Sequence, residues 1–83
     1  MNVYDIELVQ TSIACPEQYD AIDCVTKQEI GYLRLRHGRF TVEVPGPGGR
    51  LVYESHPAGD GIFEEAERTG ELNRAIEAIA AAY

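Results

Sequence analysis

The sequence of 83 residues contains no tryptophan, one methionine, two cysteines and two histidines. Eight residues separate Cys15 from Cys24, and eighteen separate His37 from His56. This arrangement fits no zinc-finger spacing, because such sites need close pairs of ligands. We therefore expect two reduced, partly buried structural thiols, no metal site and no cofactor.

Long apolar runs are also missing. No segment approaches the ~20 apolar residues that a membrane-spanning helix needs. Residues 1–8 contain acids and no basic residue, unlike a secretory signal peptide. Hydrophobic residues make up 45% of the chain and charged residues 25%, as in ordinary globular proteins. The sequence therefore predicts one cytoplasmic domain over residues 1–83, with no membrane association.

Basic residues are scarce: seven stand against 14 acids, and the net charge is −7. Residues 1–29 and residues 51–83 each carry −5, whereas residues 30–50 carry +3. A net negative charge repels nucleic acid and anionic membranes. We therefore expect no direct binding of nucleic acid, and instead a protein partner with a basic surface.

Two segments near the N-terminus favour strands. Apolar and acidic residues alternate over Val3–Val9, which predicts a strand with Tyr4, Ile6 and Leu8 on its buried face. The segment Glu17–Val25 fits two readings, a short helix that begins at Pro16 or a strand over Tyr19–Val25. We favour the strand.

Residues 31–44 predict a β-hairpin. Two alternating runs flank His37-Gly38, a pair suited to a two-residue turn with positive φ. This turn places Arg36 opposite Arg39 and Leu35 opposite Phe40. The apolar side chains then share one face, namely Leu33, Leu35, Phe40 and Val42. The polar side chains share the other face, namely Tyr32, Arg34, Arg36, Arg39, Thr41 and Glu43.

The C-terminal part predicts a loop over Pro45–Gly49, a strand over Leu51–Glu54, a second loop over His56–Gly61 and a helix from Ile62. The apolar stripe of this helix comprises Ile62, Ala66, Thr69, Leu72, Ile76, Ile79 and Tyr83. Gly70 suggests a break, with Thr69 capping a second piece. The predicted fold class is α+β, an antiparallel meander of three to five strands covered by a C-terminal helix.

Two charged surfaces are candidate binding sites. Arg34, Arg36 and Arg39 share one hairpin face, and they either pair with Glu43, Tyr32 and the acidic segments of the same chain or bind an external anion. On the helix, Glu64, Glu67 and Glu71 follow i, i+3, i+7 spacing, which resembles the spacing of phosphates along a nucleic-acid strand. Asp60 adds negative charge near the helix start.

No combination of residues favours catalysis. The loop Pro45–Arg50 is rich in glycine, but it lacks the Lys-Ser or Lys-Thr and the following helix of a phosphate-binding loop. A cysteine could pair with His37 or His56, yet His37 has a structural role in the turn and His56 precedes Pro57 in a loop. We therefore expect a binding protein and not an enzyme.

The block Gly31–Phe40, followed by Val52–Glu54, Gly59–Glu64 and Glu67–Arg68, resembles a family of small proteins of phages and mobile elements. The resemblance covers about half of the chain. Size and acidity are similar to those of anti-defence inhibitors, especially anti-CRISPR proteins. Many of these present negative charge as a DNA mimic, so the resemblance implies an inhibitory role, but it assigns no individual residue.

The sequence thus favours a phage-type inhibitor that acts as a monomer in the host bacterial cytoplasm. It would dock on the basic nucleic-acid-binding surface of a defence complex, such as a CRISPR-Cas surveillance complex, and block DNA binding. The contact residues expected for it are Glu64, Glu67, Glu71 and Asp60. The alternative is a general protein-interaction module that uses the Tyr32, Arg34, Arg36 and Arg39 sheet face.

Overall fold

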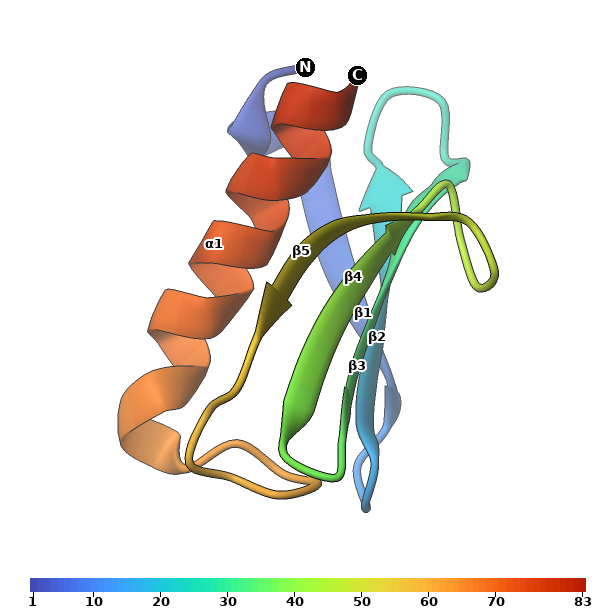
Figure 1. The fold of residues 1–83 in the computed structure, drawn as a ribbon. Helices are drawn as coiled ribbons and strands as arrows, with labels where there is room; N and C mark the ends of the chain where they lie inside the picture. The colour runs from blue at the N-terminus through green and yellow to red at the C-terminus, as the bar shows by residue number, and fades with distance from the viewer.

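The computed structural model describes residues 1–83 and has an α+β fold, as predicted. Five antiparallel strands form one sheet in the order β1-β2-β3-β4-β5, and the helix α1 follows at the C-terminus (Figure 1). The elements in chain order are the short 3-10 turn η1 (Val3–Asp5), β1 (Ile6–Ser12), β2 (Glu17–Asp23), β3 (Glu29–Arg36), β4 (Arg39–Val44), β5 (Arg50–Ser55) and α1 (Glu65–Ala82). Each strand pairs with its neighbour in sequence, so the sheet is a simple meander.

The hairpin of β3 and β4 has the predicted register. Arg36 lies opposite Arg39, and the pairing continues to Tyr32 opposite Glu43. His37 has a φ of 54° and Gly38 a φ of 71°, as a two-residue hairpin turn requires. The four apolar side chains of the predicted inner face have no exposed surface, namely Leu33, Leu35, Phe40 and Val42. Alternation of side chains along the two strands therefore separates a core face from an outer face.

Helix α1 covers the core face of the sheet. It lies beside β5 and β4 (Figure 1) and buries Ala75, Ile79 and Ala80. Gly31 of β3 allows this close approach, since a Cβ atom there would lie 2.8 Å from Cδ1 of Ile79. No helix combines the length and the apolar character needed to cross a lipid bilayer.

Two predictions near the N-terminus need correction. Val3–Asp5 forms a 3-10 turn and not a strand, because the Asn2 side chain accepts a hydrogen bond from the Tyr4 N–H at 2.9 Å. Tyr4 is consequently 88% exposed, although Ile6 and Leu8 do face the core. The second predicted strand exists, but β2 ends at Asp23, where the Asp23 carboxylate accepts from the Val25 N–H at 2.8 Å and the chain turns.

The predicted helix is present, but its start and its buried face differ from the prediction. Glu64 and Glu67 form a capping box, so α1 begins at Glu65 and not at Ile62. The helix continues through Gly70, so Thr69 caps no second piece. The side chains of Ala75 and Ile79 face the sheet, which leaves Ala66 and Thr69 of the predicted stripe exposed. Ile62 precedes the helix and is exposed, whereas the hydroxyl of Tyr83 donates to the carbonyl oxygen of Ile30 at 2.7 Å. Leu72 and Ile76 lie at the margin of the core.

Candidate functional site: an arginine hollow on the open face of the sheet

The sheet face opposite α1 has no covering layer, and we call it the open face. It carries alternate side chains of neighbouring strands. These are Gln18 and Asp20 of β2, Tyr32, Arg34 and Arg36 of β3, Arg39, Thr41 and Glu43 of β4, and Glu54 of β5. Because the register of the hairpin is fixed, these side chains have defined neighbours: Gln18, Arg34, Thr41 and Glu54 form one row across four strands. The open face is therefore polar along β3 and β4, while the exposed apolar side chains of Val9 and Leu51 lie at its margins on β1 and β5.

A hollow of about 350 Å³ lies on the open face beside the hairpin turn. Its lining contains no apolar side chain and consists of Arg34, Arg36, His37, Arg39 and Thr41. We call this site the arginine hollow. All three arginines predicted as a cluster thus lie together, at the end of the open face where β3 turns into β4.

One of the three arginines has an internal partner. The guanidinium of Arg39 forms an ion pair and hydrogen bond with Glu54, and both side chains are substantially exposed. The hydrogen bond from Arg39 holds the pKa of the Glu54 carboxyl below its usual value. His56 approaches the same carboxylate at 3.9 Å. Glu54 therefore relieves part of the repulsion between the directly opposed Arg36 and Arg39.

The other two arginines have no partner. Neither Arg34 nor Arg36 takes part in an ion pair or a side-chain hydrogen bond. Arg34 is half-buried and Arg36 is exposed. The arginine hollow therefore presents two guanidinium groups whose hydrogen-bond donors are free for an external anion.

The opposite end of the open face is acidic. Asp20 lies opposite Tyr32 on one side, and Glu43 lies opposite Tyr32 on the other. Desolvation, together with a hydrogen bond to Asp20 and its negative charge, raises the pKa of the nearby Glu29 carboxyl. The open face is thus polarised, with arginines at the turn end and carboxyl groups around Tyr32.

The predicted acidic column on the helix does not form a continuous exposed surface. Glu64 is exposed at the helix start, but Glu67 accepts hydrogen bonds from the N–H groups of Ala58, Gly59 and Glu64 at 2.8–2.9 Å. The bonds from the Glu64 and Gly59 N–H groups lower the pKa of Glu67. Its carboxylate therefore holds the preceding loop to the helix.

Glu71 was expected on the solvent face, and this prediction is wrong. The residue is only 6% exposed and points at β5. Its carboxylate accepts from the Tyr53 hydroxyl at 2.7 Å, the Ser55 hydroxyl at 2.6 Å and Nε of Arg74 at 3.3 Å. Burial acts to raise its pKa, but these hydrogen bonds outweigh that effect and lower it. Helical spacing alone could not predict that Glu71 has hydrogen-bond donors on β5.

Asp60 does not extend the helix column either. Its carbonyl oxygen accepts from the Gly38 N–H at 2.6 Å, and its side chain lies near the same glycine. The loop before the helix therefore packs against the β3–β4 turn. Asp60 belongs to the surroundings of the arginine hollow.

A buried ionic network at Glu17 was missed by the sequence analysis. Glu17 is 2% exposed, and its carboxylate accepts hydrogen bonds from Arg68 at 2.9 and 3.2 Å, from the Phe63 N–H at 3.0 Å and from the Tyr19 hydroxyl. Arg68 also binds the exposed Glu65 at 2.6 Å. The network joins β2 to the start of α1. No local sequence pattern predicts this network, because its members are up to 51 positions apart.

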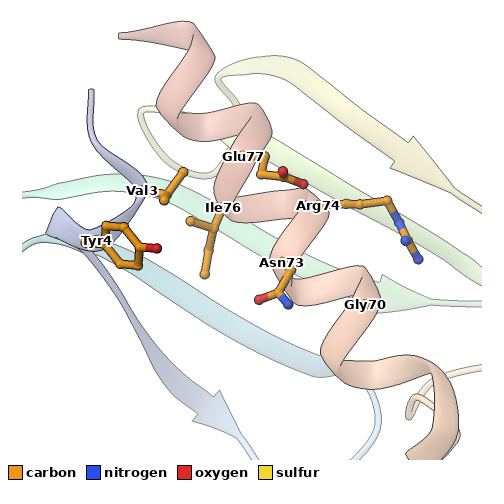
Figure 2. A pocket seen from close by; sticks show the side chains of 7 residues that line it. All are labelled: Val3, Tyr4, Gly70, Asn73, Arg74, Ile76 and Glu77. Atoms are coloured by element: carbon orange, nitrogen blue, oxygen red, sulfur yellow. The ribbon is translucent and has the colours of Figure 1, made fainter.

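A second depression, of about 520 Å³, lies between η1 and α1 (Figure 2). Val3 and Tyr4 line it on one side and Asn73 and Ile76 on the other, while Arg74 points away from Tyr4. Arg74 is already bonded to Tyr53 and Glu71. This depression is larger than the arginine hollow, but it presents no charged group that lacks an internal partner except Glu77 at its rim.

The two cysteines do not form a disulfide. Cys15 and Cys24 are free thiols. Cys24 is partly buried as expected, whereas Cys15 is exposed, with its Sγ close against the backbone of Gly61. The structure contains no group of three or more His, Cys, Asp and Glu side chains placed to hold a metal ion.

Comparison of the chain with protein-family models, with curated proteins and with solved structures found no match. The resemblance to phage and mobile-element proteins therefore stays a prediction.

Proposed function

We propose that this protein is a binding module, not an enzyme, and that it docks on a protein partner through the open face. The observation that carries the proposal is the pair Arg34 and Arg36, two unpaired guanidinium groups on the sheet face that α1 leaves bare. Exposed arginines repel one another unless an anion lies between them. A partner carboxylate or similar group would supply that anion.

The surrounding residues suit a protein interface. Tyrosine and arginine dominate the energetic centres of interfaces, and Tyr32 is half-buried next to Arg34 along the strand direction. The side chains stand on paired strands whose register is fixed, so the backbone loses little conformational freedom on binding. The basic and acidic ends of the open face would also fix the orientation of a partner with the complementary polarity.

The role proposed for this module is inhibition of a bacterial defence complex. The net charge of −7 favours approach to a basic surface. However, the carboxylates of Glu67 and Glu71 already accept hydrogen bonds within the protein. In this proposal the overall charge attracts the partner, and the open face rather than the helix makes the contact.

The test compares two matched charge reversals. Arg36→Glu alters the open face, whereas Arg50→Glu alters an exposed arginine at the far end of β4 and β5. Both change the net charge by the same two units, and neither arginine forms an ion pair in the fold. The wild type is used to capture its partner from a bacterial extract. Arg50→Glu should still capture this partner and Arg36→Glu should not, and affinities are then measured with the purified partner.

A third variant separates the two candidate surfaces. Glu77→Lys reverses an exposed acid of α1 that has no bonded partner. The open-face proposal expects this variant to bind like the wild type. Loss of binding in Glu77→Lys together with full binding in Arg36→Glu would move the contact to the helix. Circular dichroism of each variant establishes that it is folded.

A further inference from the structure

We infer that the arginine hollow binds one compact dianion, a phosphate monoester group carried by the protein partner. The inference rests on the proposed function, because it names the chemical group that the open face recognises. It is carried by three features: the charge of the hollow, the placement of its donors and the acidic residues around it.

The charge of the hollow matches a phosphate monoester. Arg34, Arg36 and Arg39 contribute three positive charges, and Glu54 neutralises one of them. Two positive charges remain, against about −1.5 to −2 for a phosphate monoester at neutral pH. A carboxylate brings a single negative charge, so one guanidinium would stay uncompensated. Asp60, beside the turn, and Glu43, two residues beyond Thr41 on β4, do not bond to the arginines of the hollow.

The donors come together from two paired strands. Arg34 and Arg36 stand on the same face of β3, two residues and therefore roughly 7 Å apart along the strand. Arg36 lies opposite Arg39, and Arg34 lies opposite the buried Thr41, whose side chain also lines the hollow. Guanidinium groups bind phosphate oxygens in a bidentate manner, which a lysine ammonium group does not. The arrangement provides several N–H donors around one position.

The acidic surroundings of the hollow oppose the binding of an extended polyanion. The hollow, of about 350 Å³, lies at one end of the open face, beside the hairpin turn. A nucleic-acid strand that crossed the open face would meet Asp20, Glu43 and Glu54, and the whole molecule carries −7. Repulsion of the neighbouring phosphates would oppose such binding. A phosphorylated residue that projects from a protein surface meets only the hollow.

The binding site can be tested without the partner. The full protein, labelled with ¹⁵N, is titrated with phenyl phosphate and with benzoate at constant ionic strength, and NMR follows the backbone amides of residues 36–41 and the arginine Nε–H groups. Phenyl phosphate should give saturable shifts confined to the hollow, with an affinity at least about fivefold higher than that of benzoate. Arg34→Gln combined with Arg36→Gln should abolish the shifts, and Arg50→Gln should retain them.

Three outcomes would overturn the inference. The first is that the shifts caused by phenyl phosphate do not saturate. The second is that the Arg34→Gln and Arg36→Gln double variant shows the same shifts as the wild type. The third is equal affinity for benzoate, which would assign the hollow to carboxylates. None of these outcomes bears on the proposed function, because that proposal is tested separately by partner binding of Arg36→Glu.

The origin of the phosphate group is tested on the captured partner. Treatment of the purified partner with a phosphatase should weaken its binding to the wild type by about tenfold or more, since charge-assisted hydrogen bonds to phosphate are lost. Unchanged binding after complete dephosphorylation would contradict a phosphate group on the partner, even if the hollow binds phenyl phosphate. The Arg34→Gln and Arg36→Gln double variant should bind the treated and untreated partner equally.

Discussion

Single residues decide which charges of this protein are available for binding. Burial acts to raise the pKa of Glu17, but hydrogen bonds from Arg68, Tyr19 and Phe63 outweigh it, so the pKa lies below its usual value of 4.5. The hydrogen bonds to Glu17 and Glu65 raise the pKa of Arg68, and burial with the bond to Glu17 raises the pKa of Tyr19 to about 12. Glu17 and Arg68 therefore stabilise the fold and are not free for a partner.

Replacement of Glu17 by glutamine should reduce the free energy of unfolding by about 2–4 kcal/mol, because Arg68 then loses its buried counter-charge. Glu65→Gln provides the matched control, since Glu65 binds the same arginine but its side chain is 94% exposed. Urea unfolding of both variants measures the difference. Equal free energies of unfolding for the two variants would show that the buried Glu17 carboxylate contributes no more to stability than the exposed Glu65 carboxylate.

The same residue predicts a dependence on pH. The pKa of Glu17 is lower in the folded than in the unfolded state, so its contribution is complete above about pH 4.5 and is lost as the pH falls through the folded-state value. The wild type should therefore lose stability on acidification more steeply than Glu17→Gln. Thermal unfolding at a series of pH values between about 3 and 7 gives the two slopes. Parallel curves would contradict the assignment.

The sequence could not identify which carboxylates are bonded inside the fold. Glu71 lies three residues from Arg68 and Arg74 and fits a solvent-exposed helix row by spacing. Its burial depends on Tyr53 and Ser55, 16 to 18 positions away on β5. Helical periodicity contains no information about such partners, because it describes one element and not what the element packs against.

At the scale of elements, the β3–β4 hairpin was the most predictable part of the chain. Its two-residue turn, its strict alternation and its register are local properties, and the structure confirms each of them. The arginine cluster of the hollow could be predicted for the same reason, because the hairpin register alone brings Arg34, Arg36 and Arg39 together. The start and the rotation of α1 depend on the loop and the sheet, and these were predicted less well.

Gly38→Val should destabilise the hairpin by about 1–2 kcal/mol or more, because a β-branched residue fits a φ of 71° poorly. Gly38→Asn is the control, since asparagine adopts positive φ at a lower cost. Thermal unfolding of the two variants gives the comparison. A valine variant as stable as the asparagine variant would mean that the turn does not hold the register of the open face.

Gly70→Ala should stabilise α1 by about 0.5–1 kcal/mol, because alanine has the higher helix propensity. The added Cβ would lie 3.3 Å from the guanidinium of Arg74, the far end of an exposed side chain that can move slightly. A rise in Tm is the expected result. A fall in Tm would indicate that Tyr53 and Glu71 hold Arg74 in place, so that the added Cβ disrupts these hydrogen bonds and destabilises the helix.

For the whole molecule, the central feature is the contrast between two sheet faces. Helix α1 covers one face, while the open face combines a basic end with an acidic end on a chain of net charge −7. Exposed charges act over roughly 8–10 Å at physiological salt. Association with the partner should therefore slow several-fold as salt rises from about 0.05 to 0.5 M, with a smaller change in dissociation. Stopped-flow measurements that show rates independent of salt would contradict electrostatic recognition.

The most direct test of the account is a map of the contact surface in the purified complex. Cross-saturation NMR with the labelled protein and its unlabelled partner reports which amide and arginine Nε–H protons lie close to the partner. The account predicts that signals decrease within the β3–β4 hairpin, from Tyr32 to Glu43, including Nε–H of Arg34 and Arg36. A decrease confined to Glu64 at the helix start and to the exposed acids Glu65 and Glu77 of α1, with an unchanged hairpin, would contradict it.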